Sequence, residues 1–217
     1  MKLGIALPIT DRREENDFWM SFLMMDKPNF NLYLPDFPAG DYHESISAVR
    51  NNLVLQAMRD ECTHLLMCDT DQAYPQDALT KLLSHKKLMV GAVVHRRYPP
   101  FEPIINRGEL GRYVHVPDDE IESGDLIEVD STGAGCLLFN MDVFFAVEQP
   151  WFENTLIDGK VVGEDIHFCS KVKEVGIPIH IDTSILIDHL TMARVNRTFY
   201  KMYKKFNNIQ WKELKDV

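Results

Sequence analysis

The stretch Thr63-His64-Leu65-Leu66-Met67-Cys68-Asp69-Thr70-Asp71 decides the fold. Residues 64–68 form a short, mostly apolar run, which is typical of a buried strand. The two aspartates end that run, and ligands in open α/β sheets bind at the carboxyl ends of the strands. Carboxylates two residues apart at that position suit a hard divalent cation, which prefers oxygen ligands. The stretch therefore predicts a buried strand that leads into a metal site, although a loop that only caps the next helix is the alternative.

Strands and helices alternate on both sides of this stretch. Leu3 to Ile9 is predicted as a buried first strand, and Leu88 to Val94 as a later one. Glu44 to Glu61 has apolar residues at helical spacing, and Pro75 suits the first turn of a further helix. Such alternation predicts parallel strands joined by right-handed crossovers, as in a nucleotide-binding α/β sheet.

The second half of the chain is less regular. Residues 95–130 contain prolines, glycines, short β runs and an acidic stretch, so we expect a β-rich insertion there. Two helices and a bent strand or strand pair are predicted after it: Met141 to Val147, Glu164 to Val175 and Ile177 to Ile187. With no linker or repeat, residues 1–192 are predicted to form one domain, and residues 193–217 a basic aromatic helix or lid.

The composition is that of an ordinary soluble protein of 217 residues. It excludes collagen, coiled coils and chains that are disordered throughout. The formal net charge of −10 argues against a general nucleic-acid coat, because an acidic chain repels polyphosphate unless its cations are gathered in one place. The four cysteines form no C-x-x-C pair and are expected to be reduced core residues. No apolar run reaches the length of about 18 residues that a membrane span needs, and we expect a cytoplasmic protein.

Three blocks, residues 48–54, 63–71 and 75–79, together resemble the nucleotide-sugar-dependent glycosyltransferases of the GT-A fold, especially those similar to family 2. Gly163-Glu164-Asp165-Ile166-His167-Phe168-Cys169 and the later His189 strengthen the resemblance. It implies a GT-A (Rossmann-like) α/β fold, with a central, mostly parallel sheet flanked by helices, a small β-rich insertion and a C-terminal helical tail.

The resemblance also implies roles for the acidic residues. Asp69 and Asp71 would be the D-x-D pair, which holds Mn²⁺ or Mg²⁺ together with His189, and Asp69 would lie nearer the ribose or sugar. Asp165 would be the catalytic base of an inverting enzyme, and Glu164 would orient the acceptor or support the base. The alternative for Glu164 and Asp165 is an acidic first helical turn that only stabilises the helix dipole.

The donor site is implied in the same way. The nucleotide would lie against the end of the first strand, at Pro8, Thr10 and Asp11. Arg50 would approach the nucleotide or its phosphates, and the turn Gly133-Ala134-Gly135 would let the backbone come close to the donor sugar. A solvated or ion-paired arginine and a simple tight turn are the structural alternatives.

The predicted insertion, residues 95–130, would lie on the acceptor side of the site. Two segments are candidate acceptor contacts. His95 to Phe101 combines cations with aromatic rings after a predicted strand, and Trp151 to Glu153 precedes the acidic pair. An exposed proline-rich loop and core packing, respectively, are the alternatives.

The predicted activity is metal-dependent transfer of a sugar from a nucleoside-diphosphate sugar to an acceptor hydroxyl, by inverting displacement. UDP-sugars are the favoured donors, with GDP-sugars as the alternative, and the acceptor is a glycan, a small molecule or a modified nucleic acid. The chain has no Q-x-x-R-W motif, which argues against polymerisation of a long glycan. A retaining mechanism, transfer to modified DNA bases, and a non-catalytic module that binds a nucleotide or glycan remain open, and the sequence does not indicate an oligomeric state.

Overall fold

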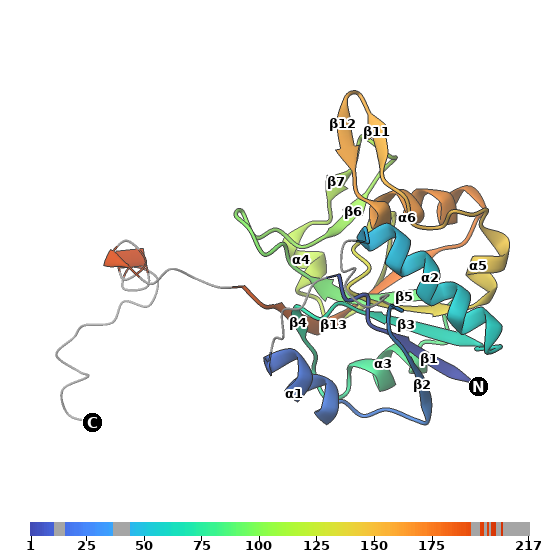
Figure 1. Ribbon diagram of the computed structural model, residues 1–217. Helices are drawn as coiled ribbons and strands as arrows, with labels where there is room; N and C mark the ends of the chain where they lie inside the picture. Colours follow the sequence, from blue (N-terminus) through green and yellow to red (C-terminus); the bar gives the residue numbers. More distant parts are fainter. Residues whose placement is uncertain are drawn as a thin grey trace.

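The computed structural model describes residues 1–10, 16–36 and 44–191, with a few single residues between 196 and 205. In this part of the chain an eight-stranded mixed sheet has the order β2-β1-β3-β10-β5-β13-β4, and β8 pairs with β13 (Figure 1). The strands that run in one direction are β1 (Leu3–Ala6), β2 (Phe30–Tyr33), β3 (His64–Cys68), β5 (Met89–Val94) and β13 (Ile179–His189). The strands that run against them are β4 (Gln72–Ala73), β8 (Leu126–Val129) and β10 (Cys136–Asn140). The predicted, mostly parallel α/β sheet is confirmed.

One strand corrects the prediction of parallel neighbours throughout. Strand β10 lies between β3 and β5 and is antiparallel to both, with Cys136 opposite Cys68 and Leu138 opposite Val90. Residues 136–139 are all buried. A strand that is covered on both faces reads as a continuous apolar run, and such a run carries no sign of its direction.

Helices cover both faces of the sheet (Figure 1). On one face lie α2 (Ile46–Arg59), α5 (Asp142–Ala146) and α6 (Glu164–Glu174), whose apolar residues share one core cluster. On the other face α1 (Asn16–Met24) and α3 (Ala78–Ser84) contribute to a second cluster. The predicted helix around α2 forms because Ser45 caps it, accepting a hydrogen bond from the Ala48 N–H at 3.2 Å, and because its apolar stripe is buried.

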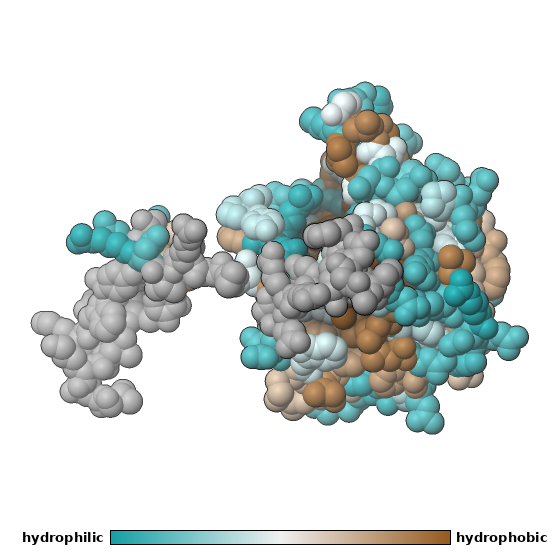
Figure 2. Space-filling view, viewed as in Figure 1, coloured by the Kyte–Doolittle hydropathy of each residue, from teal (hydrophilic) through white to brown (hydrophobic). Residues whose placement is uncertain are grey.

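The region predicted as a β-rich insertion divides between two sheets. Strands β6 (Ile105–Arg107), β7 (Val114–His115) and β9 (Ser131–Thr132) form a small separate sheet, with α4 (Asp118–Ile121) beside it, whereas β8 joins the main sheet. A second small sheet, the hairpin β11 (Thr155–Ile157) and β12 (Lys160–Val162), projects from the body of the molecule (Figure 1). Apolar residues are exposed on this hairpin (Figure 2).

Strand β13 brings distant residues to the site. It is one strand with a register shift between Asp182 and Leu186, so the alternative of a bent strand is confirmed over that of a strand pair. Its last residues pair with β4, and this register places His189 opposite Gln72, directly after the D-x-D stretch. Most of the predicted C-terminal helix, residues 193–217, lies outside the described residues. Among the helices that the structure describes, none is long and apolar enough to cross a membrane.

Candidate functional site

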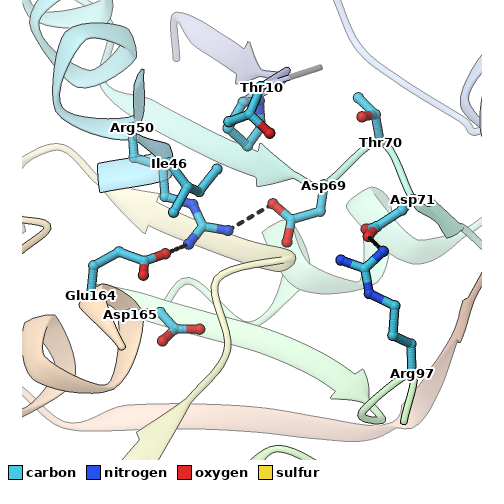
Figure 3. A pocket seen from close by; sticks show the side chains of 10 residues that line it. Thr10, Ile46, Arg50, Asp69, Thr70, Asp71, Arg97, Glu164 and Asp165 are labelled. Carbon is cyan, nitrogen blue, oxygen red and sulfur yellow. Dashed lines mark hydrogen bonds and ion pairs between the residues drawn. The ribbon is translucent and has the colours of Figure 1, made fainter. Parts of the chain in front are cut away.

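A cleft of about 350 Å³ lies where β1, β3 and β5 end and where α2 and α6 begin (Figure 3). The chain leaves β1 for β2 on one side and returns to β3 on the other, so the cleft opens at a topological switch point, the place where open α/β sheets bind ligands. The cleft is lined by Pro8, Thr10, Ile46, Arg50, Asp69, Thr70, Asp71, Arg97, Glu164 and Asp165.

Arg50 is the central cation of this cleft. It lies on the buried face of α2 and is only 3% exposed. Its Nη2 donates to Oδ1 of Asp69 at 2.7 Å, and its Nη1 donates to Oε1 of Glu164 (Figure 3). Burial lowers the pKa of Arg50, but Asp69, Asp165 and Glu164 raise it further than burial lowers it, so the guanidinium is charged. One buried side chain therefore joins the D-x-D loop to the start of α6.

Asp165 lies beside this ion-pair cluster, in the first turn of α6. Its Oδ1 accepts a hydrogen bond from the Ile166 N–H at 2.8 Å, and the Ala134 backbone also hydrogen-bonds the carboxylate. Burial raises the pKa of Asp165 above the usual range, although Arg50 opposes the shift. A carboxylate whose pKa is moved toward neutrality is better matched to accepting a proton.

The glycine turn before β10 approaches Asp165 closely. A Cβ atom added at Gly133 would lie 3.5 Å from Oδ2 of Asp165, which is ordinary contact, and the O atom of Gly135 accepts a hydrogen bond from the Asp69 N–H at 2.9 Å. The turn Gly133-Ala134-Gly135 thus borders both the D-x-D loop and Asp165. Its contact with a donor sugar stays a prediction.

Asp71 belongs to a second cluster. Its Oδ2 accepts from Nη1 of Arg97 at 2.8 Å and lies 3.3 Å from Nε2 of His189. Nδ1 of His189 lies 2.7 Å from the His95 carbonyl oxygen, so Nδ1 carries the hydrogen and donates it there. Burial raises the pKa of Asp71, but His189 and Arg97 lower it below its usual range.

The predicted metal ligands are only partly brought together. Asp69 faces Arg50, whereas Asp71 faces Arg97 (Figure 3), and the described residues contain no group of three or more His, Cys, Asp or Glu side chains arranged for a metal. Yet Nε2 of His189 is buried without a hydrogen-bond partner and faces Asp71. Burial lowers the pKa of His189, but Asp71 and the His95 carbonyl raise it above its usual range, so in the metal-free protein Nε2 carries a hydrogen that faces Asp71. Loss of that proton would present the Nε2 lone pair to a cation, in the way that metal-binding histidines do. Asp71 and His189 therefore fit one divalent cation.

The remaining predicted residues have mixed outcomes. Pro8 and Thr10 line the cleft, while Asp11 lies outside the described residues. Trp151 and Phe152 are each 1% exposed and pack in the core, so they form no acceptor platform. Sequence reasoning missed three lining residues as donor-site candidates: Ile46, Thr70 and Arg97. Because it follows a strand, the segment His95 to Phe101 was predicted as an acceptor contact, so Arg97 was placed with the acceptor rather than in the donor site.

The hydroxyl of Tyr74 connects the D-x-D loop to the glycine turn before β10. This buried hydroxyl lies 2.8 Å from the carbonyl oxygens of both Asp69 and Gly135. We expect Tyr74→Phe to lower stability by about 1–2 kcal/mol, because a buried carbonyl loses its donor, and to lower the thermal midpoint by about 2–8 °C. Thermal unfolding measures the effect, with Tyr98→Phe as the control, since that residue is 69% exposed. Equal midpoints for the two variants would contradict this role.

Comparisons with known proteins identify the fold. No family model and no curated protein matches the chain. Among solved structures, A197 from STIV is similar with a TM-score of 0.61 and 13% identity, over 88% of this chain and 87% of that one. GalNAc-T7 with UDP, GalNAc and Mn²⁺ has a TM-score of 0.54 and 8% identity, over 89% of this chain and 44% of that one. TarS of S. aureus in complex with UDP-GlcNAc has a TM-score of 0.49 and 14% identity, over 94% and 65% of the two chains.

The similarities to A197 and GalNAc-T7 lie at the level of the fold, because both identities are low. The chain covers nearly all of A197 but less than half of GalNAc-T7. The GT-A α/β fold that the sequence predicts is confirmed.

Proposed function

We propose that this chain is a metal-dependent glycosyltransferase, which moves a sugar from a nucleoside diphosphate to an acceptor hydroxyl. The observation that carries the proposal is the pairing, in one cleft at the switch point, of the half-buried Asp165 carboxylate for proton transfer with the Asp71–His189 pair for a cation. The GT-A fold of a neighbour that contains UDP, GalNAc and Mn²⁺ supports a UDP-sugar donor, with a GDP-sugar as the alternative.

The charges of the cleft support a divalent cation. Four carboxylates line it, from Asp69, Asp71, Glu164 and Asp165, and only two guanidinium groups oppose them. With all of these groups ionised the cleft is negative, so an anionic diphosphate needs a bridging cation to bind there. Asp71 and His189 would hold Mn²⁺ or Mg²⁺. Asp69, two residues before Asp71 in the same loop, pairs with Arg50. When bound, the ion would neutralise negative charge on the departing nucleoside diphosphate.

Asp165 would perform the proton transfer. As the acceptor oxygen attacks the anomeric carbon, the bond from that carbon to the donor phosphate breaks, and the hydroxyl proton passes to the Asp165 carboxylate. Attack from the face opposite the leaving group inverts the configuration. Arg50 and Glu164 would hold the start of α6 against the D-x-D loop, which fixes the distance between the base and the donor.

Asp71→Asn tests the metal assignment. We expect it to lower metal-dependent turnover of the accepted donor by about 100-fold or more, because an amide is a weak ligand and carries no charge. The wild-type chain is first assayed with UDP-, GDP-, CMP- and dTDP-sugars, with and without Mn²⁺, and the product is detected by mass spectrometry. Asp77→Asn is the matched control, because Asp77 pairs with Lys81 on an exposed helix turn. Unchanged turnover in Asp71→Asn, with the same circular dichroism, would contradict the assignment.

A further inference from the structure

Arg97 occupies the side of Asp71 on which a cation would bind. Its Nη1 lies 2.8 Å from Oδ2 of Asp71, the same oxygen that Nε2 of His189 faces at 3.3 Å. Two of the three predicted metal ligands, Asp71 and His189, therefore meet at one point, and the guanidinium supplies positive charge there. Figure 3 shows Arg97 reaching Asp71 from the loop after β5.

The two arginines of the cleft are held very differently. The Arg50 side chain is 4% exposed and contacts two carboxylates. The Arg97 side chain is 37% exposed, pairs with Asp71 alone among the described carboxylates, and otherwise lies 5.7 Å from the ring of the exposed Tyr98. A partly exposed ion pair contributes about 0–1 kcal/mol. Arg97 can therefore leave Asp71 at little cost, whereas Arg50 cannot leave its partners.

We propose that Arg97 changes partners: it neutralises Asp71 in the free protein, and it turns to the donor diphosphate when a metal ion binds at Asp71 and His189. The inference rests on the proposed function for the identity of the donor. One carboxylate oxygen cannot serve a guanidinium and a divalent ion side by side without strong repulsion between the two cations. Arg97 already lines the same cleft as Thr10 and Asp69, and a guanidinium pairs with phosphate through two parallel hydrogen bonds.

This exchange makes metal and nucleotide binding cooperative. In the free protein the metal must displace Arg97, which weakens its affinity. Once displaced, Arg97 is available to the diphosphate, so each ligand favours the other, and the coupling must be equal in both directions. Removal of the guanidinium should therefore change the two affinities in opposite senses.

Isothermal titration calorimetry of the full chain tests the exchange, with MnCl₂ alone and with UDP at saturating MnCl₂. We expect Arg97→Ala to bind Mn²⁺ alone about fivefold more tightly than the wild type, and to bind UDP with Mn²⁺ about tenfold more weakly. Arg96→Ala is the matched control. Arg96 is an exposed neighbour on the same loop, with the same charge and no side-chain ion pair among the described residues, and its substitution should change either affinity by less than about twofold.

The outcomes separate this exchange from the proposed function. If Arg97→Ala and Arg96→Ala bind Mn²⁺ equally well, or if both affinities of Arg97→Ala fall together, the exchange is overturned. If neither the wild type nor Arg97→Ala binds Mn²⁺, both the exchange and the metal site of the proposed function fail. If the two affinities change in opposite senses but no nucleotide sugar is turned over, the exchange holds and the proposed activity fails.

Discussion

Asp165→Asn is expected to lower the rate of sugar transfer by about 10²–10⁴-fold, the usual contribution of a positioned base. Asparagine has the same shape and can still accept from the Ile166 N–H, but it cannot take the acceptor proton. Nucleotide and Mn²⁺ affinities should stay within about threefold of wild type, because Asp71 and His189 are untouched. Single-turnover rates, together with calorimetry for UDP, distinguish the loss of chemistry from the loss of binding.

The pH dependence of the wild type follows from the same residue. Because burial raises the pKa of Asp165, the rate should rise with pH through that raised value and level off above it, since only the carboxylate accepts a proton. The raised pKa of Asp165 also affects stability, because the ionised carboxylate is disfavoured in the folded state. A carboxyl with a raised folded pKa stabilises the fold below that pKa and loses this contribution as the pH rises through it. Relative to Asp165→Asn, the wild type should therefore become less stable as the pH increases.

Asp142→Asn is the matched control for both measurements. Asp142 lies in the first turn of α5, as Asp165 lies in the first turn of α6, but it is exposed and away from the cleft. It should keep the wild-type rate and pH profile. A rate for Asp165→Asn within threefold of wild type would show that another group takes the proton.

The part of the fold that the sequence predicts is the part with local signals. Strand β3 was predicted over its full length because an apolar run ends sharply at Asp69, and α2 because its apolar residues recur at helical spacing. The hairpin β11–β12 was not predicted, although the dipeptide Asp158-Gly159 is typical of a two-residue hairpin turn. In the structure both residues have the positive φ that such a turn requires. The sequence of β10 does not indicate its direction, because a buried apolar run has the same pattern in a parallel and an antiparallel strand.

In the candidate site, too, local sequence signals predict single residues but not which side chains pair with one another. The strand-end rule identified Asp69 and Asp71 from neighbouring residues alone. Which cation each carboxylate faces is decided by long-range packing: Arg50 and Glu164 are 114 residues apart in the chain, and His189 reaches Asp71 only through the register of β13 with β4. No spacing in the sequence records such pairings, and so Arg97 was not assigned to Asp71.

Trp151 illustrates why residue type alone misleads. Its ring is buried, and its indole N–H donates to the carbonyl oxygens of Phe144 and Val147, at 2.9 and 3.0 Å. A tryptophan needs a partner for this N–H when it is buried, and the end of a short helix supplies one. Trp151 and Phe152, although close to Glu164 and Asp165 in the sequence, therefore complete the core.

Arg50→Met is expected to have the largest effect on stability, about 3–5 kcal/mol, which is the usual cost of removing one partner from a buried ion pair. Methionine keeps the apolar part of the side chain but leaves Asp69, Glu164 and Asp165 without a counter-charge. The thermal midpoint at pH 7 should fall by roughly 6–20 °C. Arg59→Met is the matched control, because Arg59 is an exposed arginine in the last turn of the same helix, and it should leave the midpoint unchanged.

The pH dependence of that loss distinguishes an electrostatic role from simple packing. Without Arg50 the carboxyl pKa values in the folded state should rise, because burial then acts unopposed, and a raised folded pKa stabilises the fold below it. The deficit of Arg50→Met should therefore shrink as the pH falls from 7 toward 5, and Glu164→Gln in the same chain should recover part of it at pH 7. A deficit that stays constant with pH and is not relieved by Glu164→Gln would mean that Arg50 stabilises α2 through packing alone. In that case the ion-pair cluster would not be what holds the base against the D-x-D loop.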